Sequence, residues 1–415
     1  MKRVLLYSQD GLGLGHLRRS SNIGHEILSR DPECNGLILA DSPASSYVPQ
    51  RPGLEVLKLP TIVKTGRASA RTSSWHSWAL HLDIRQVLRL RASVMLDALR
   101  TFAPDVFLID HMPLGALGEL KQVLDHALAL ARPPRLLLGL RDVLEDPAVI
   151  REAWSEMGVY DYLHHFETVL IYGRREIFDA AAAYDLERHV RRIEYCNYVS
   201  PPGSRDPLVE APARPYLLMT GGGGHDAFPL AAAFLDAQPI MQKRLGIQSV
   251  LLAGPTMPPV QRKALLARAN GSTKIVNGQE GADGWVRRAA AVITMGGYNS
   301  MCEVLQWQKK ALIVPRDGPS EEQITRAQLF ERKGLVKTLE PAALTPERLV
   351  EDVESLMAEK GIPDQANIPP LDGASRAAEV VLEEVPGLPD VARGANGFWA
   401  GDRLGTVRHG SGRRR

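Results

Sequence analysis

The stretch that decides the fold reads Tyr216-Leu217-Leu218-Met219-Thr220-Gly221-Gly222-Gly223-Gly224-His225-Asp226. Its apolar part, 216–220, predicts a buried strand, and the pattern at 227–242 predicts a helix after the glycines. Four consecutive glycines are costly to order, so they are rarely kept as packing filler. The backbone amides of Gly221, Gly222, Gly223 and Gly224 can surround a diphosphate without any side-chain charge. The alternative is a tight turn under the helix.

A second glycine loop follows the strand predicted at 291–294 and leads into a helix predicted at 298–308. The first amides of this helix and its partial positive charge are suited to a phosphate. A carboxylate one turn further on can accept two hydrogen bonds from the vicinal hydroxyls of a ribose. The residues that we expect to bind a nucleotide here are Gly296, Gly297, Tyr298, Asn299, Ser300 and Glu303.

A third polar loop, Pro315-Arg316-Asp317-Gly318-Pro319-Ser320-Glu321-Glu322-Gln323, follows the strand predicted at 311–314. Arg316, Glu321 and Gln323 supply groups suited to sugar hydroxyls. The sequence contains no Asp-x-Asp triplet, the usual short motif for a metal that bridges a nucleotide diphosphate. We therefore expect no metal and no cofactor, with amides, helix dipoles and Arg316 stabilising a leaving group.

The N-terminal half opens with its own glycine loop, which contains Gly11, Gly13, Gly15 and then His16 after the strand predicted at 3–8. A dinucleotide fingerprint would place a glycine where His16 or Arg18 stands, so the spacing excludes a dehydrogenase of that kind. The glycines are expected to leave the first amides of the following helix open to an anion or to a ligand with hydroxyls.

His16 and Asp110 are the candidate catalytic residues of this half, because both follow predicted strands at the edge where open α/β sheets bind ligands. An imidazole there can remove a proton from an acceptor hydroxyl. His16 could instead only cap or pack the helix start, and Asp110 could be a turn or N-cap aspartate ahead of a helix at 114. Asp142 is a weaker case of the same kind.

The segment 60–82 contains Trp75 and Trp78 together with basic residues and shows little periodicity. Loops of this length are usually functional or disordered. Tryptophans beside Lys64, Arg67 and Arg71 would suit a sugar, a lipid headgroup or a phosphate-bearing acceptor, and equally a loop folded over its own core. With Gly11, Gly13 and Gly15, the two tryptophans are assigned to the acceptor side.

Apolar runs alternate with helical patterns along both halves, which predicts an α/β fold with parallel sheets covered by helices. Expected strands are 3–8, 36–40, 54–58, 105–109, 135–139 and 168–172, then 216–220, 248–252, 273–276, 291–294 and 311–314. Expected helices include 16–30, 83–102, 114–130, 321–333, 346–358 and 373–384. A proline-rich stretch within 201–214 predicts a linker between a domain of residues 1–200 and one of residues 215–385. Residues 386–415 predict a disordered basic tail.

Composition restricts the class of protein further. The formal charge is +2, from 50 basic and 48 acidic residues, so nothing indicates a nucleic-acid partner. No apolar run approaches the roughly 20 residues of a membrane span. Three well separated cysteines, Cys34, Cys196 and Cys302, fit neither a disulfide framework nor a zinc site, so we expect a cytoplasmic protein.

The glycine loops, Glu303 and the 315–323 stretch together resemble the GT-B glycosyltransferases related to the bacterial transferase that adds N-acetylglucosamine to the lipid-linked cell-wall precursor. The resemblance covers about residues 1–385 and is looser in the first half, where segment 60–82 has no counterpart. It implies two Rossmann-like, doubly wound parallel-sheet domains facing across a cleft, a UDP-sugar donor, inversion at the anomeric carbon and no metal. It also implies that Glu303 binds the ribose, that Gln323 lies in the donor-sugar loop and that His16 ends the acceptor-side loop.

A hexosyltransferase that takes a sugar such as N-acetylglucosamine from UDP and gives it to an unidentified hydroxyl is therefore the favoured function. The acceptor can be a small molecule, a glycan or a lipid-linked compound, and the last would bring the protein to the inner face of a membrane. A nucleotide-sugar epimerase or hydrolase would use the same cleft. A non-catalytic nucleotide-sugar binder would not need His16 as well as the donor loops.

Overall fold

The polypeptide forms two parallel β-sheets, and their strands follow the order of the apolar runs in the sequence. The computed structural model describes residues 2–49, 51–65, 74–200, 211–212, 214–269, 271, 273–276, 282–318 and 320–385. All of them belong to one compact unit, residues 1–385. The two sheets confirm the expected α/β architecture.

The first sheet has seven described strands in the order β3-β2-β1-β6-β7-β8-β9. Their bounds are β1 Arg3–Ser8, β2 Asn35–Ala40, β3 Leu54–Lys58, β6 Val106–Asp110, β7 Arg135–Arg141, β8 Thr168–Tyr172 and β9 Ile193–Tyr195. Side chains alternate between the two faces of the sheet. Val4 and Leu6 of β1 therefore enter one apolar cluster, and Leu5 and Tyr7 enter another.

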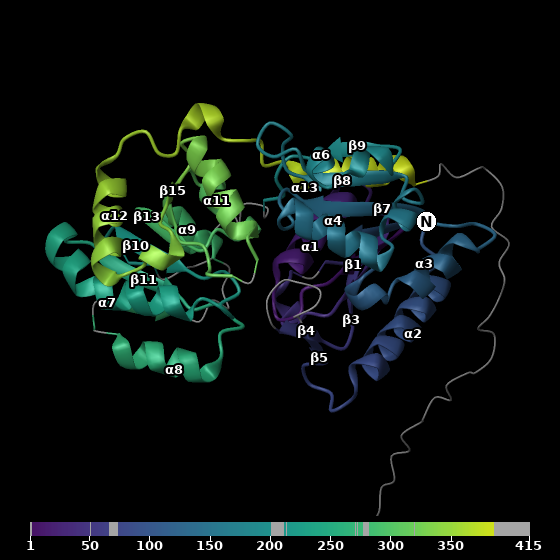
Figure 1. Cartoon of the computed structure of the whole chain (residues 1–415), viewed down its shortest axis with the longest axis horizontal. Coiled ribbons are helices and arrows are strands. Elements are labelled where there is room, and N and C mark those ends of the chain that lie inside the picture. Colours follow the sequence, from purple (N-terminus) through teal and green to yellow (C-terminus); the bar gives the residue numbers. More distant parts are fainter. Residues whose placement is uncertain are drawn as a thin grey trace, which may run out of the picture. The chain divides into compact units, whose positions relative to one another are not determined.

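Helices cover both faces of this sheet and connect its strands (Figure 1). They are α1 Gly15–Arg30, α2 Ile84–Phe102, α3 Lys121–Leu128 and α4 Pro147–Met157, with the short α5 Tyr160–Leu163 and α6 Ala180–Ala183. Helix α2 begins with a capping box, in which Asp83 and Gln86 satisfy each other's backbone amides. The expected helix 114–130 starts later, at Lys121, because Gly115 and Gly118 adopt positive φ angles of 67° and 78° ahead of it.

The second sheet has six described strands in the order β12-β11-β10-β13-β14-β15. Its strands are β10 Tyr216–Thr220, β11 Gln248–Leu252, β12 Thr273–Val276, β13 Ala291–Thr294, β14 Lys310–Ile313 and β15 Lys337–Thr338. Its helices are α7 Phe228–Leu245, α8 Pro259–Arg268, α9 Asp283–Arg288, α10 Tyr298–Gln306, α11 Glu322–Arg332 and α12 Pro346–Ala358. Tyr198 joins the core of the first sheet to that of the second, since its ring lies 5.9 Å from the ring of Tyr298 and 5.5 Å from that of Phe330.

The strand order places the ligand-binding edge of each sheet. In the first sheet β1 lies between β2 and β6, and in the second β10 lies between β11 and β13. Connections diverge on either side of such a strand, and the crevice at its carboxyl end is where open α/β sheets bind ligands. His16 follows β1 and Asp110 ends β6, while the two C-terminal glycine loops follow β10 and β13.

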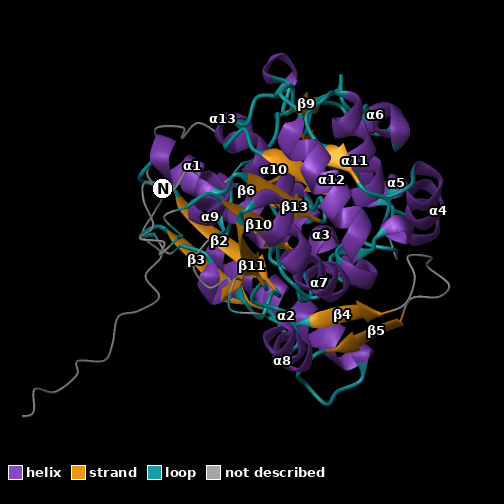
Figure 2. Cartoon of the chain, turned by 90° about the vertical axis from the view of Figure 1, so that its left-hand side faces the viewer, coloured by secondary structure: helices purple, strands orange, loops and turns teal. Residues whose placement is uncertain are grey.

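Segment 60–82 is not the irregular loop that we expected. It contains an antiparallel hairpin of β4 Ile62–Thr65 and β5 Ser74–Ser77, which stands apart from the parallel strands in Figure 2. The strands are short and carry polar residues, so their alternation is too brief to be read from the sequence. Arg67 and Arg71 lie outside the described residues.

Helix α13, Gly373–Glu384, returns to the first sheet although it follows the second sheet in sequence. Arg30 of α1 donates to Ser375 and Glu379, at 2.6 and 2.8 Å, and Val199 forms a bridge with Asp372. Figure 1 shows α13, in yellow, among the elements of the first sheet. The range 215–385 therefore does not lie wholly on the second sheet. Residues 201–210 and 213 of the expected linker, and the expected tail 386–415, lie outside the described residues.

Candidate active site

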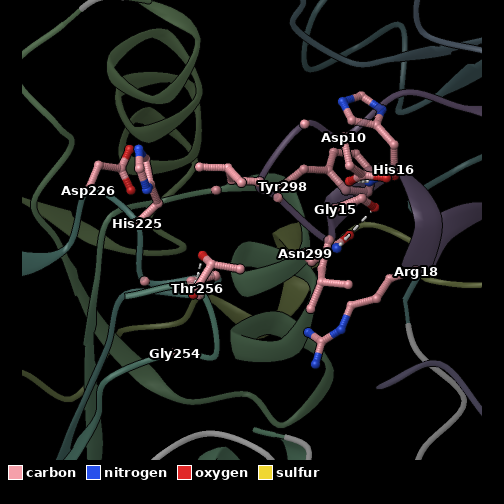
Figure 3. A pocket seen from close by; sticks show the side chains of 18 of the residues that line it. Asp10, Gly15, His16, Arg18, His225, Asp226, Gly254, Thr256, Tyr298 and Asn299 are labelled. Atoms are coloured by element: carbon pink, nitrogen blue, oxygen red, sulfur yellow. Dashed lines mark hydrogen bonds between the residues drawn. The ribbon is translucent and has the colours of Figure 1, made fainter. Parts of the chain in front are cut away.

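A cavity of about 730 Å³ lies at the carboxyl ends of both sheets. It is lined by the loops after β1, β6, β10, β11 and β13 and by part of the 315–323 segment. The structure thus brings Gly11, Gly13, Gly15 and His16 to the same cavity as Gly221–Gly224, Gly297–Ser300 and Glu303. The expected nucleotide-binding residue Gly296 does not line the cavity; its φ angle is 76° and a Cβ there would lie 2.7 Å from the Ile313 side chain, so the turn and close packing require this glycine. Figure 3 shows His16 and Arg18 across this space from His225 and Asp226, with Asn299 hydrogen-bonded to Gly15.

The four consecutive glycines divide into two roles. A Cβ on Gly221 would lie 2.1 Å from the Cβ of Ala227, and one on Gly224 would lie 2.2 Å from the Ala253 carbonyl oxygen. These two positions are therefore required by close packing, as the tight-turn alternative proposed. A Cβ on Gly222 or Gly223 would meet its nearest atom only at 3.4 or 3.5 Å, but Gly222 has a φ angle of 63°, which also favours glycine. Gly223 alone of the four is required neither by close packing nor by a positive φ angle.

The loop after β13 starts helix α10 without a side-chain cap. Gly297 is the N-cap residue, and the side chain of Ser300 is buried beside Gly222. The Asn299 amide donates to the Gly15 carbonyl oxygen at 3.2 Å, which joins the starts of α10 and α1. Tyr298 has a structural contact besides lining the cavity, because its hydroxyl accepts the Val199 N–H at 2.9 Å.

Glu303 lies on the buried side of α10 and is only 4% exposed. Burial raises the pKa of its carboxyl, and the neighbouring Arg18 opposes that shift. The Arg18 Nη1 atom lies 3.4 Å from Glu303 Oε1, so a residue of α1 reaches the carboxylate that we expected to bind a ribose.

The third loop differs from the expectation in one residue. Glu321 is exposed, donates its backbone N–H to Glu145 and does not line the cavity, whereas the neighbouring Glu322 is buried and does. The helical turn at the start of α11 points the two side chains in different directions. Gln323 Oε1 accepts the Arg316 N–H at 3.1 Å, and Arg316 Nη1 pairs with Asp226 at 3.0 Å. Arg316 therefore already has an acidic partner.

The first glycine loop is not an open anion cradle. The carboxylate of Asp10 accepts the N–H groups of His16 and Leu17 at 2.8 and 2.7 Å. The Gly13 N–H donates to the Asp10 carbonyl oxygen and the Gly11 N–H to Asp41. The expectation that this loop leaves its amides to a ligand is wrong for these four groups, because two aspartates occupy them. The loop instead holds the His16 side chain at the cavity.

His16, Asp110 and Arg19 form a buried cluster beside the cavity. Arg19 donates to both carboxylate oxygens of Asp110, at 3.0 and 2.6 Å, and His16 Nδ1 lies 2.6 Å from Asp110 Oδ2. Burial alone would raise the pKa of Asp110, but the charge of Arg19 and the hydrogen bond from His16 outweigh it and hold that pKa below its usual range. Asp110 is thus a paired carboxylate rather than the helix cap that was the alternative.

The tautomer of His16 follows from these contacts. Arg19 Nη2 also lies 2.7 Å from His16 Nδ1, and arginine can only donate, so Nδ1 cannot both accept from Arg19 and donate to Asp110. An ionised carboxylate is the stronger acceptor, and we therefore assign the Nδ1 proton to the His16–Asp110 hydrogen bond. This tautomer leaves Nε2 unprotonated and able to take a proton.

His111 was not expected at the site, yet its ring centroid lies 4.5 Å from that of His16. Its φ angle of 70° is in the left-handed region, where non-glycine residues are strained and often functional. Burial and the charge of Arg141 hold the pKa of His111 well below its usual value, so the ring is neutral. The feature of the sequence that could have identified His111 is its position directly after the strand that ends in Asp110.

A buried ion network joins the two sheets behind the cavity. Arg326 of α11 contacts Asp142 at 2.8 Å and Glu322 at 3.0 Å, and Glu322 also pairs with Arg141 at 2.8 Å. Burial opposes ionisation of Glu322, but the two arginines lower its pKa to about 2. Asp142, the weaker of the candidate aspartates, is thus a structural partner. The sequence alone could not predict this contact, because Asp142 and Arg326 are 184 positions apart.

Trp75 and Trp78 of the hairpin segment also line the cavity. Trp75 packs against the small apolar cluster beneath the hairpin, while Trp78 is 53% exposed. Trp75 therefore fits a segment folded over its own core, whereas Trp78 stays a candidate for the acceptor side.

Across the part of the chain that the structure covers, no three His, Cys, Asp or Glu side chains gather as they would around a metal ion. In the same residues no helix is both long and apolar enough to span a bilayer.

Known glycosyltransferases are similar to this chain in sequence. Residues 217–378 match the glycosyltransferase family 28 C-terminal domain. An uncharacterized glycosyltransferase of Methanosarcina mazei is 22% identical over 90% of this chain and 96% of its own length. A shorter match, 37% identical over 17% of this chain and 20% of the relative, is to the UDP-N-acetylglucosamine–N-acetylmuramyl-(pentapeptide) pyrophosphoryl-undecaprenol N-acetylglucosamine transferase of Streptococcus uberis.

Solved structures show the same fold. The glycotransferase of kitacinnamycin superimposes with a TM-score of 0.62 at 16% identity, over 93% of this chain and 99% of that one. Medicago truncatula UGT71G1, complexed with UDP-glucose, gives 0.60 at 10% identity, over 93% and 98%. The fold is GT-B, with the two expected parallel sheets. Together with the matched domain and the named relatives, it identifies the chain as a glycosyltransferase.

Proposed function

We propose that this glycosyltransferase moves a hexose, such as N-acetylglucosamine, from a UDP-sugar to a hydroxyl of its acceptor, with inversion and without a metal ion. The observation that carries the proposal is the single cavity in which the glycine loops and Glu303 face His16. The donor named for the Streptococcus uberis relative and the UDP-glucose held by the Medicago truncatula protein support the choice of UDP.

The donor would lie along the carboxyl edge of the second sheet. The amide of Gly223 and those at the start of α10 would surround the diphosphate, because a helix N-terminus and glycine amides favour anions. The Gly222 N–H already donates to Thr220 Oγ1 at 3.3 Å. Glu303 would accept hydrogen bonds from the two ribose hydroxyls. Gln323, beside Glu322, would face the sugar.

The reaction would be a single displacement at the anomeric carbon. His16 Nε2 takes the proton of the acceptor hydroxyl, whose oxygen forms the new bond as the bond to the β-phosphate oxygen breaks. The electron pair leaves with UDP. Asp110 stabilises the imidazolium that forms, through the Nδ1–H bond. Attack from the face opposite the diphosphate inverts the anomeric centre.

Replacing Glu303 by alanine is expected to weaken UDP binding about ten- to hundredfold, since hydrogen bonds to charged groups contribute about 1.5–3 kcal/mol. Glu303→Gln should lose less, because its amide oxygen still accepts one bond. Calorimetry with UDP and melting curves of both variants measure this.

Melting serves as the control for Glu303. A carboxyl with a raised pKa is protonated more readily in the folded than in the unfolded protein, so its ionised form lowers stability at neutral pH. Glu303→Gln should therefore melt no lower than the wild type at neutral pH. If Glu303→Ala instead shows a small drop in melting temperature and an unchanged UDP affinity, Glu303 only supports its helix.

Donor binding is expected to survive removal of divalent metal. Amides and helix termini neutralise the diphosphate in the proposed mode, so no bridging cation is needed. UDP titrations with and without EDTA should give the same dissociation constant within about twofold. Loss of UDP affinity in EDTA, restored by Mg²⁺ or Mn²⁺, would contradict the metal-free proposal.

A further inference from the structure

Arg18 extends from helix α1 of the first sheet into the part of the cavity assigned to the nucleotide. Its Nη1 atom lies 3.4 Å from Glu303 Oε1, and its side chain is 39% exposed where that of Glu303 is 5% exposed. Figure 3 shows the guanidinium on the same side of the cavity as Asn299. The contact therefore brings a cation from the acceptor half to the donor half.

The other guanidinium groups on the cavity wall are held more closely by carboxylates. Among the described lining residues, Arg19 lies 2.6 Å from Asp110, Arg141 lies 2.8 Å from Glu322 and Arg316 lies 3.0 Å from Asp226. Arg19 and Arg141 are also mostly buried. Arg18 has the longest ion pair and the most exposed side chain of the four, so it can take a new anionic partner at the least expense of existing contacts.

We propose that Arg18 binds the diphosphate of the donor and stabilises the departing UDP. This rests on the proposed function. Glu303 follows Tyr298, the first residue of α10, by five residues, or roughly 7.5 Å along the helix axis, so a phosphate at the first amides of α10 lies within reach of the long Arg18 side chain. Arginine carries five N–H donors and can hold Glu303 and a phosphate oxygen together.

The charge of the reaction gives this arginine its role in the transition state. When the bond between the anomeric carbon and the β-phosphate oxygen breaks, the electron pair stays on UDP, which gains one negative charge. A fixed cation in a partly dry cavity stabilises charge that develops in this way. In this proposal the leaving-group role first assigned to Arg316 passes to Arg18, because Asp226 holds Arg316 more closely, at 3.0 Å, than Glu303 holds Arg18, at 3.4 Å.

The position of Arg18 depends on contact between the two sheets. The hydrogen bond from Asn299 to the Gly15 carbonyl oxygen holds the start of α1 against the start of α10, one turn from Arg18. The same turn of α1 carries His16. One helix thus supplies the group that receives the acceptor's proton and the group that stabilises the leaving diphosphate.

The test compares UDP with uridine, which has the ribose and base without phosphates. Arg18→Met should weaken UDP binding about tenfold or more and change uridine binding less than about twofold. Arg18→Lys should retain part of the UDP affinity, because it keeps a point charge. Arg316→Met, on the same cavity wall, is the matched comparison and should lose less UDP affinity than Arg18→Met. Melting curves establish that each variant is folded.

Two results would overturn the proposal. Equal losses of UDP and uridine affinity in Arg18→Met would show that Arg18 only supports Glu303 against the ribose. Unchanged UDP affinity in Arg18→Met, with a loss in Arg316→Met, would return the role to Arg316. A wild-type protein that binds neither UDP nor uridine would contradict the proposed function itself, which distinguishes the two failures.

Discussion

Replacing His16 by alanine is expected to lower turnover about a hundredfold or more while leaving UDP affinity nearly unchanged. His16 lies on the acceptor side of the cavity, and its Nε2 atom is free to take a proton when Nδ1 donates to Asp110. The proposed donor contacts come from the loops of the second sheet and from Arg18, and this substitution leaves all of them in place. Turnover is measured as UDP released from UDP-N-acetylglucosamine to an acceptor or to water, and UDP affinity by calorimetry.

Asp110 is the rival for this role and needs a separate control. Asp110→Asn would remove the charge that pairs with the buried Arg19, which is expected to cost about 3–5 kcal/mol of stability. Its activity must therefore be compared well below its melting temperature. Unaltered turnover in His16→Ala, together with a loss in folded Asp110→Asn, would transfer the base to the aspartate.

Replacing Asp142 by alanine is expected to lower the free energy of unfolding by about 3–5 kcal/mol. The change leaves Arg326, whose side chain is 0% exposed, without its closest carboxylate. Asp142, directly after β7 of the first sheet, also contacts α11 of the second, so both sheets lose a shared contact. Urea denaturation of the wild type and the variant measures the difference.

A surface ion pair supplies the control for Asp142. Arg268 and Asp236 lie 2.8 Å apart, but their side chains are 45% and 46% exposed. Water screens such a pair, and Asp236→Ala should change stability by less than about 1 kcal/mol. Equal effects of the two substitutions would show that the Asp142–Arg326 contact does not stabilise the folded chain beyond an ordinary surface pair.

The same ion network makes the stability of the folded protein depend on pH in the acidic range. The pKa of Glu322 is lowered from 4.5 to about 2, so Glu322 stabilises the folded protein above its unfolded pKa. That contribution is lost as the pH falls from about 4.5 toward 2. The network is therefore expected to persist through mildly acidic conditions.

The features that the sequence predicted correctly are those that depend on residues close together in the chain. The runs at 216–220 and 291–294 became β10 and β13, because a strand buried on both faces is apolar throughout. The glycine loops lie at the cavity for the same local reason, since each follows a strand at the carboxyl edge of a parallel sheet. The hairpin β4–β5 was not predicted because each of its two strands has only four residues, too few to show a period.

The sequence by itself determined the α/β fold, the two sheets and the loops that surround the cavity, because strand period and glycine spacing are local properties. Only the tertiary structure decided which charged groups are available to a ligand. The Asp10 carboxylate accepts hydrogen bonds from amides that the first loop was expected to offer to a ligand, and Asp226 forms an ion pair with Arg316. Arg18 instead reaches Glu303, 285 positions away in the sequence. Such pairings depend on how the two sheets approach each other, and charge partners distant in sequence leave no local pattern.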